Sequence, residues 1–235
     1  MIKSFKVVAL GLSLLLANVC VSHAQDFQKG FAAYEKEDYA TVLKEWRPLA
    51  DRGDAEAQFY LGLMYKNGQG VTQDYKEAVR LYGLAAVQGD ADAQISLGEM
   101  YNSGQGVTQD KKETVRLYRL AAEQGIAQAQ NNLGAMYING QGVTQDSKEA
   151  IKWYRLAAEQ GNADAQYNLG WMYYIGLGII QDNVNAYMWY NIAASGGDAN
   201  AVNERDVIAK KMTRSQLEKA QDLASECVKK NYRGC

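Results

Sequence analysis

The chain has 235 residues, a formal net charge of −2, and charged residues of both signs that make up 22% of the sequence. This mildly acidic balance argues against a nucleic-acid-binding domain, because such domains carry a basic stripe that displaces counterions from phosphate. Hydrophobic residues make up 47% of the chain, which is typical of a folded protein.

Residues 1–24 have the pattern of a secretory signal peptide. Lys3 and Lys6 precede an apolar run at 7–16, and small residues end the segment. We expect cleavage before Gln25 and export to the periplasm or the cell exterior.

Two other interpretations of this N-terminus are weaker. A membrane anchor would need a longer apolar run to span about 30 Å of hydrocarbon, so no stable insertion is expected after cleavage. A lipid anchor would use Cys20, but Val19 before it is bulkier than the small residue expected there.

Cleavage would leave 23 basic and 27 acidic residues, a formal charge of −4, and no histidine, because the only one is His23. Without imidazole, the usual general base, the serine and cysteine triads, and the common zinc ligand set are missing. We therefore expect no enzymatic activity, no cofactor and no bound metal.

Residues 25–53 are expected to form an N-terminal capping helix pair. Gly30, Asp38, Trp46 and Gly53 stand where each later repeat has a glycine, a helix cap, an aromatic residue and a stop glycine. The turn between the two helices is shorter than in the repeats.

Residues 54–197 repeat with a fixed period of 36 residues and no insertion or deletion. A period of this size predicts a solenoid, in which each unit buries its apolar face against its neighbours. The four repeats are 54–89, 90–125, 126–161 and 162–197.

Each repeat is expected to contain two amphipathic helices joined by a Gly-x-Gly turn such as Gly68-Gln69-Gly70. The first glycine suits the left-handed residue that ends a helix, and the second lets the chain reverse. A phosphate-binding loop is disfavoured, because no strand precedes the turn and no lysine follows it at the required spacing.

The second helix of a repeat begins at Asp74, with Glu77 three residues later, which is the pattern of a capping box. Because the aspartate recurs at each helix start, we interpret it as structural and not catalytic. Glycine inside the first helix, as at Gly62, opposes helix formation by about 1 kcal/mol relative to alanine. We expect an aromatic residue of the second helix to pack over each such glycine; the pairs are Gly62/Tyr82, Gly98/Tyr118, Gly134/Tyr154 and Gly170/Tyr190.

The repeated pattern AxAxxxLGxxYxxGxGVxxDxxxAxxxYxxAAxxG resembles the Sel-one-like repeat family, a branch of the tetratricopeptide-like α/α solenoids. The resemblance covers residues 54–197 and implies an all-α, right-handed superhelix of helix pairs that serves as a protein-interaction scaffold. The chain departs from the family's cysteine-rich branch, because no cysteine lies between Cys20 and Cys227.

Residues 198–235 are expected to form a half-repeat and a capping helix that starts at Thr213, where Thr213 and Gln216 form a capping-box pattern. In an exported chain Cys227 and Cys235 would form a disulfide. The alternative is two unpaired thiols near the end of the chain.

The repeats differ from one another at four positions that share one face of the first helix. In tetratricopeptide-like solenoids this face lines the concave groove, so the resemblance implies a binding surface there. Trp171 and Tyr174 are either groove residues or core residues packed against the helix at 199–210. The predicted binding residues are Phe59, Tyr60, Leu63, Lys66, Ile95, Ser96, Glu99, Asn102, Asn131, Asn132, Ala135, Ile138, Tyr167, Asn168, Trp171 and Tyr174.

The preferred hypothesis is a non-enzymatic exported scaffold that binds a protein or peptide. The alternative is an envelope protein that interacts with peptidoglycan or a β-lactam, with weak hydrolase activity, as the resemblance to exported family members suggests. Hydrolysis by carboxylates alone needs two acids about 5 to 10 Å apart, and the predicted face holds only Glu99. The sequence identifies neither the partner nor the oligomeric state.

Overall fold

The computed structural model describes residues 25–235, so the predicted signal peptide lies outside the described residues. A helical segment at 25–34 is followed by eleven α-helices, and residues 25–235 form no strand. None of the helices in this part of the chain is both long enough and apolar enough to cross a membrane. The helices are α2 (Tyr39–Asp51), α3 (Ala55–Asn67), α4 (Tyr75–Val87), α5 (Ala91–Ser103), α6 (Lys111–Glu123), α7 (Ala127–Asn139), α8 (Ser147–Ala158), α9 (Ala163–Ile175), α10 (Asn183–Ser195), α11 (Ala199–Ala209) and α12 (Arg214–Lys229).

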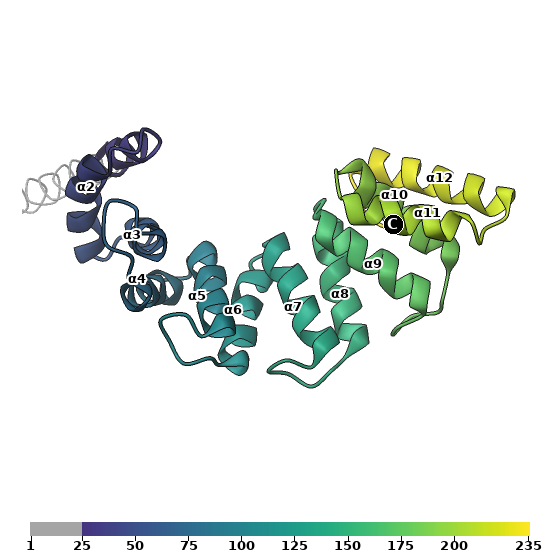
Figure 1. Cartoon of the computed structure of the whole chain (residues 1–235), viewed down its shortest axis with the longest axis horizontal. Helices are drawn as coiled ribbons and strands as arrows, with labels where there is room; N and C mark the ends of the chain where they lie inside the picture. Colours follow the sequence, from purple (N-terminus) through teal and green to yellow (C-terminus); the bar gives the residue numbers. More distant parts are fainter. Residues whose placement is uncertain (1–24) are drawn as a thin grey trace, which may run out of the picture. The chain divides into compact units, whose positions relative to one another are not determined.

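The chain divides into two compact units within the second repeat. The first unit holds the residues up to Met100 and the turn Gly104–Thr108, and the second holds Tyr101–Ser103 and Gln109–Cys235. Within the first unit α3 packs against α4, and within the second α7 packs against α8 and α9 against α10 (Figure 1). Each of these pairs is the two-helix repeat predicted from the period.

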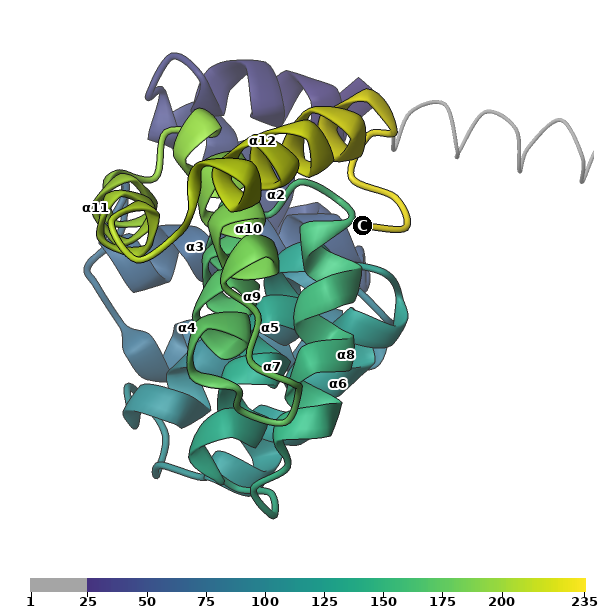
Figure 2. The same ribbon diagram turned by 90° about the vertical axis from the view of Figure 1, so that its right-hand side faces the viewer.

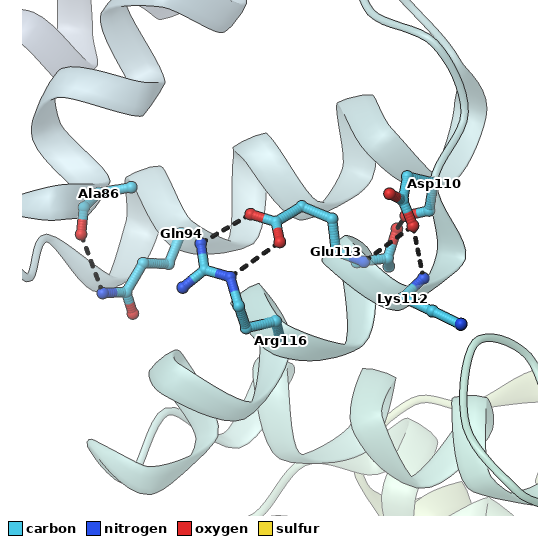
Figure 3. A network of polar contacts seen from close by, with 7 residues as sticks. Ala86, Gln94, Asp110, Lys112, Glu113 and Arg116 are labelled. Atoms are coloured by element: carbon cyan, nitrogen blue, oxygen red, sulfur yellow. Dashed lines mark hydrogen bonds and ion pairs between the residues drawn. The ribbon is translucent and has the colours of Figure 1, made fainter.

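The predicted aspartate caps are present, but the reciprocal half of the capping box is not. The Asp110 carboxylate accepts from the backbone amides of Lys112 at 2.9 Å and Glu113 at 3.1 Å (Figure 3). The Glu113 carboxylate turns away from the cap and binds Arg116, whose Nε and Nη2 donate at 2.8 and 2.6 Å. An ion pair one turn along the helix competes with the cap amide for the same carboxylate, and here the ion pair is formed.

In the repeats on either side, the glutamate likewise binds a basic residue in place of the cap amide. Glu77 binds Arg80, and Glu149 binds Lys152. The capping box predicted at Thr213 and Gln216 is complete in both directions.

Both glycines of the Gly-x-Gly turn have a structural reason. Gly68 ends α3 in the left-handed conformation, with φ of 71°. Gly70 also has a positive φ of 68°, and a Cβ placed on it would overlap the side chain of Tyr39 at the start of α2. The second glycine therefore does more than reverse the chain, because it also lets the turn pack against the preceding helix pair.

The glycines inside the first helices lie under aromatic rings, as predicted. A Cβ at Gly134 would be 2.7 Å from Cε1 of Tyr154, and one at Gly170 would be 2.8 Å from Cδ1 of Tyr190. In the N-terminal cap, Gly30 lies against Trp46 in the same way. The contact expected between Gly98 and Tyr118, which belong to different units, stays a prediction.

The C-terminal helix α12 crosses α10 and covers it (Figure 2). Ala220, Ala224 and Cys227 are buried on the face predicted to close the core, while Leu217 and Leu223 are partly buried beside them. Cys227 and Cys235 form a disulfide with a Cα–Cα distance of 5.6 Å.

Candidate binding surface

Each first helix has residues that recur in every repeat and support the predicted surface, and these are called the frame. A buried glutamine is one of them. Gln94 donates from Nε2 to the carbonyl oxygen of Ala86 at 3.2 Å (Figure 3), and Gln130 donates to Ala122 at 3.1 Å. The exposed fractions of the four glutamine residues are between 2% and 4%. Their recurrence every 36 residues is visible in the sequence, but their role was not predicted. The set is Gln58, Gln94, Gln130 and Gln166.

A second set of glutamines fixes the C-terminal end of each first helix. Gln73 donates from Nε2 to the carbonyl oxygen of Lys66 at 2.9 Å, and Gln181 donates to that of Tyr174 at 2.7 Å. Gln109 and Gln145 repeat this bond. The backbone of the last surface position in each repeat is thereby held by the turn that follows it.

The frame and the predicted surface differ in exposure. Frame residues such as Ala129, Leu133 and Met136 are buried in α7. Of the sixteen predicted surface residues, Ile95 and Asn131 are also buried, Glu99 is exposed, and the others are partly exposed.

In the first unit, Tyr60 belongs to the N-terminal cap more than to an open surface. Its ring lies 5.1 Å from that of Trp46 and 6.0 Å from that of Phe27, measured between centroids. Phe59 packs edge-on against Tyr60. Tyr60 therefore closes the core between the cap and the first repeat.

Lys66 and Glu99, also in the first unit, form an ion pair with an Nζ–Oε2 distance of 3.4 Å. Glu99, the single acid predicted on this face, is therefore not an isolated carboxylate. Leu63 and Ser96 complete this part of the surface and are partly exposed.

In the second unit, polar residues of the predicted surface form hydrogen bonds to other helices. Asn168 of α9 donates from Nδ2 to Oδ1 of Asn131 in α7 at 3.0 Å. Asn102 accepts from the ammonium group of Lys111, whose Nζ lies 2.6 Å from Oδ1. Asn132, Ala135 and Ile138 are partly exposed on α7.

The aromatic residues of α9 contact the core and remain partly exposed. Trp171 and Tyr174 pack against a buried cluster that includes Ala201 and Ile208 of α11. The ring of Tyr167 lies 5.3 Å from that of the buried Tyr190. Trp171 and Tyr174 thus make the contacts expected of core residues while keeping part of their surface in solvent.

Two charged residues beside these aromatics lie outside the predicted set. Lys211 donates to the Tyr174 hydroxyl and places Nζ 5.0 Å from the ring centroid. Burial raises the pKa of the Tyr167 hydroxyl, and the negative charge of the Glu204 carboxylate raises it further. Glu204 has the same place one repeat after Asn168, which is the signal that could have identified it.

The chemistry of the surface is that of recognition by area and hydrogen bonds. Aromatic rings supply contact area, and the amides of Asn132 and Asn168 offer donors and acceptors. Within residues 25–235 no group of three or more histidine, cysteine, aspartate or glutamate residues is placed to hold a metal ion.

A family model described as the Sel1 repeat matches residues 55–90, 91–126, 127–162 and 163–198, which together are more than half of the chain. A search of curated proteins gave no match.

Two solved structures are similar over most of the chain. A protective antigen of uropathogenic Escherichia coli strains, displaying an SLR fold, is 34% identical with a TM-score of 0.80, covering 90% of this chain and 48% of the antigen. The chain thus spans about half the length of that antigen. A Sel1 repeat protein from Oxalobacter formigenes is 31% identical with a TM-score of 0.75, covering 88% of this chain and 83% of that protein.

Proposed function

Because the chain belongs to the Sel1 repeat family, we propose that it is a non-enzymatic scaffold that binds a protein or peptide through the variable face of its first helices. Sel1 repeats typically mediate protein–protein interactions and are generally non-catalytic. The proposal assigns binding to the residues by which the repeats differ.

The contrast between frame and face within the second unit carries this proposal. In α7 and α9 the repeating alanine, glutamine, leucine, glycine and methionine at 129–136 and 165–172 are buried, whereas Ile138, Trp171 and Tyr174 keep part of their surface in solvent. Asn132 and Asn168, which carry amide groups, are partly exposed on the same face. Partly exposed aromatic area beside a few hydrogen-bonding groups is the composition of a protein-binding hot spot.

The test is capture of a partner by the purified protein and by its Trp171→Ala and Tyr174→Ala variants. The variants are expected to remain folded, as measured by thermal unfolding, and to lose a partner captured from envelope extract. Leu156→Ala is the matched control, because Leu156 is 44% exposed on the second helix α8, away from this face. A partner that binds all three variants as well as wild type would contradict the proposal.

The peptidoglycan alternative is separated by measuring binding to isolated sacculi in the same series. Sacculus binding that the Trp171→Ala substitution abolishes would replace the protein partner with cell-wall material. We expect no such binding.

We also propose that the chain is exported. Support comes from the N-terminal pattern of residues 1–24 and from the pairing of Cys227 with Cys235, since disulfides persist in oxidising compartments. Mass spectrometry of the protein from the producing cell should find Gln25 as its first residue, in the envelope or the medium. An intact N-terminus in the cytosolic fraction would overturn this.

A further inference from the structure

The helix α11 extends the binding surface by one more first helix, although the family match ends at residue 198. Asn131 of α7 and Asn168 of α9 are bonded across a separation of 37 residues. Tyr174 of α9 and Lys211, just beyond α11, are bonded across the same separation of 37 residues. α11 therefore lies beside α9 as α9 lies beside α7, and Glu204 is the residue 37 positions after Tyr167.

Glu204 brings an uncompensated negative charge to this surface. Its side chain is partly buried, and among residues 25–235 no lysine or arginine forms an ion pair with it. Of the nearest cations in the sequence, Arg205 binds Asp206 and Lys211 binds Tyr174. Lys210 is exposed and forms no ion pair with Glu204. A partly buried carboxylate without a cation is stabilised by any ligand that supplies one.

The hydroxyl of Tyr190 is a second unpartnered group at the same place. Tyr190 is 0% exposed, and its hydroxyl has no hydrogen-bond partner among the described residues. The ring of Tyr167 lies 5.3 Å from that of Tyr190, and burial, followed by Tyr167, the Glu204 carboxylate and Tyr174, raises the pKa of Tyr190. A buried hydroxyl left without a partner costs roughly 1 to 3 kcal/mol.

We propose that Glu204, Tyr167 and Tyr190 form a subsite for a cationic side chain, lysine or arginine, of the bound peptide. The subsite rests on the proposed function and specifies the class of peptide that this surface takes. A lysine ammonium has three N–H donors, which the Glu204 carboxylate and the two tyrosine hydroxyl oxygens can accept. Because the Tyr190 hydroxyl is buried, a neighbouring side chain must move for the ligand to reach it. We assign this movement to the partly exposed Tyr167, whose ring lies 5.3 Å from that of Tyr190 and whose face can then bind the cation.

Lys211 shows that this surface already binds a cation of its own chain. Its ammonium lies over the ring of Tyr174, seven residues and about 10.5 Å of helix beyond Tyr167. The charge of Lys211 repels a ligand cation at that end and leaves Glu204 as the attractive one. The subsite is thus placed in the N-terminal half of α9 and at the middle of α11.

The experiment selects a phage-displayed library of random peptides against the full-length mature protein, its Glu204→Gln variant and its Glu226→Gln variant. Glu226 lies exposed on the outer face of α12 and is the matched control. Peptides selected by the wild type and by Glu226→Gln are expected to be enriched in lysine or arginine at one position, and those selected by Glu204→Gln are not. Equal enrichment with Glu204→Gln, or none with the wild type, would overturn the subsite.

A selected peptide then allows a double-mutant cycle. Replacing its basic residue by glutamine should weaken binding to the wild type by about tenfold and leave binding to Glu204→Gln unchanged. Weakening by the same factor in both proteins would place the cation elsewhere and refute the subsite. Failure of the proposed function, which is peptide binding through the variable face, gives a different result. In that case the Trp171→Ala variant would select the same peptides as the wild type.

Discussion

The ring of Tyr82 in α4 lies against the bare backbone of Gly62 in α3, so close that a Cβ at residue 62 would be 2.8 Å from both Cδ1 and Cε1 of the ring. Atoms at that separation overlap, and the ring belongs to a side chain with no exposed surface. The glycine therefore allows α3 and α4 to cross closely. The same contact is repeated between α7 and α8 and between α9 and α10.

Gly62→Ala is expected to destabilise the protein by about 1 to 3 kcal/mol, the usual cost of forcing an extra methyl group into a packed core. The control is Gly83→Ala in α4, because a Cβ at residue 83 meets nothing within 4 Å. That variant should gain about 0.5 to 1 kcal/mol from helix propensity. Thermal or denaturant unfolding measures both, and a Gly62→Ala protein as stable as Gly83→Ala would contradict the crossing argument.

The crossing could be predicted from the sequence because two signals recur with the same period. Glycine inside an amphipathic helix is unfavourable, and a tyrosine returns at a constant distance from it. The position of the caps followed from the same kind of reasoning, since Asp74 stands before an apolar periodic segment. The partner of the Glu77 carboxylate could not be predicted in this way. The sequence offers it both the cap amide and Arg80, and only the geometry of the helix decides that it binds Arg80.

The surface was harder to predict than the frame. Variation between repeats marks the face, but the exposure of each side chain depends on what packs beside it, as Tyr60 shows by joining the aromatic cluster of the N-terminal cap. Glu204 was not predicted because α11 has lost the leucine-glycine pair that identifies a repeat. The alignment of α11 with α9 is seen only from the bond between Lys211 and Tyr174, which matches the bond between Asn168 and Asn131.

Gln130→Leu is expected to destabilise the protein although leucine is apolar and of similar size. The substitution removes the bond that Gln130 donates to the carbonyl of the buried Ala122 at 3.1 Å and the bond that it accepts from the amide of Gln160 at 2.8 Å. The Ala122 carbonyl keeps the backbone amide of Gly125 as a donor, so the cost is the net loss of the buried Gln130 bond, about 0.5 to 1.5 kcal/mol. Gln160→Ala is the control, since Gln160 is exposed and its loss leaves the Gln130–Ala122 bond in place; its effect should stay within about 0.5 kcal/mol. Equal unfolding midpoints for the two variants would speak against this role of the buried glutamine.

Ile126→Asp is expected to stabilise the protein. Ile126 is the N-cap of α7 and makes no side-chain cap bond, whereas Asn162 at the same position of α9 accepts from the Ala165 amide at 2.8 Å. The backbone at Ile126 already has the extended conformation of a cap, with φ of −73° and ψ of 114°. A good N-cap contributes about 1 kcal/mol, from which the partly buried apolar surface of isoleucine must be subtracted. The reverse change, Asn162→Ala, should lower the unfolding free energy by a similar amount, and a loss of stability in Ile126→Asp would show that the isoleucine packing outweighs the cap.

Reduction of the Cys227–Cys235 disulfide is expected to release the C-terminal turn before the rest of the second unit unfolds. The turn places the ring of Tyr232 where a Cβ at Gly161 would be 3.2 Å away, and the backbone amide of Gly234 donates to Glu159 Oε1 at 3.4 Å. Asn231 and Tyr232 both have positive φ, of 50° and 65°, which residues with a Cβ adopt at a cost.

The disulfide holds this unfavourable turn by closing a loop of eight residues, worth roughly 2 to 3 kcal/mol in the chain-entropy account. Hydrogen exchange of the amides of Lys230 and Tyr232, which donate to Glu226 and Cys227, should accelerate on adding reductant. Exchange in α3 should stay unchanged, because α3 belongs to the first unit. The Cys235→Ser variant, which keeps the buried Cys227, should match the reduced wild type and show no further response to reductant. Protection of Tyr232 that survives both treatments would mean that packing against Gly161 alone holds the turn.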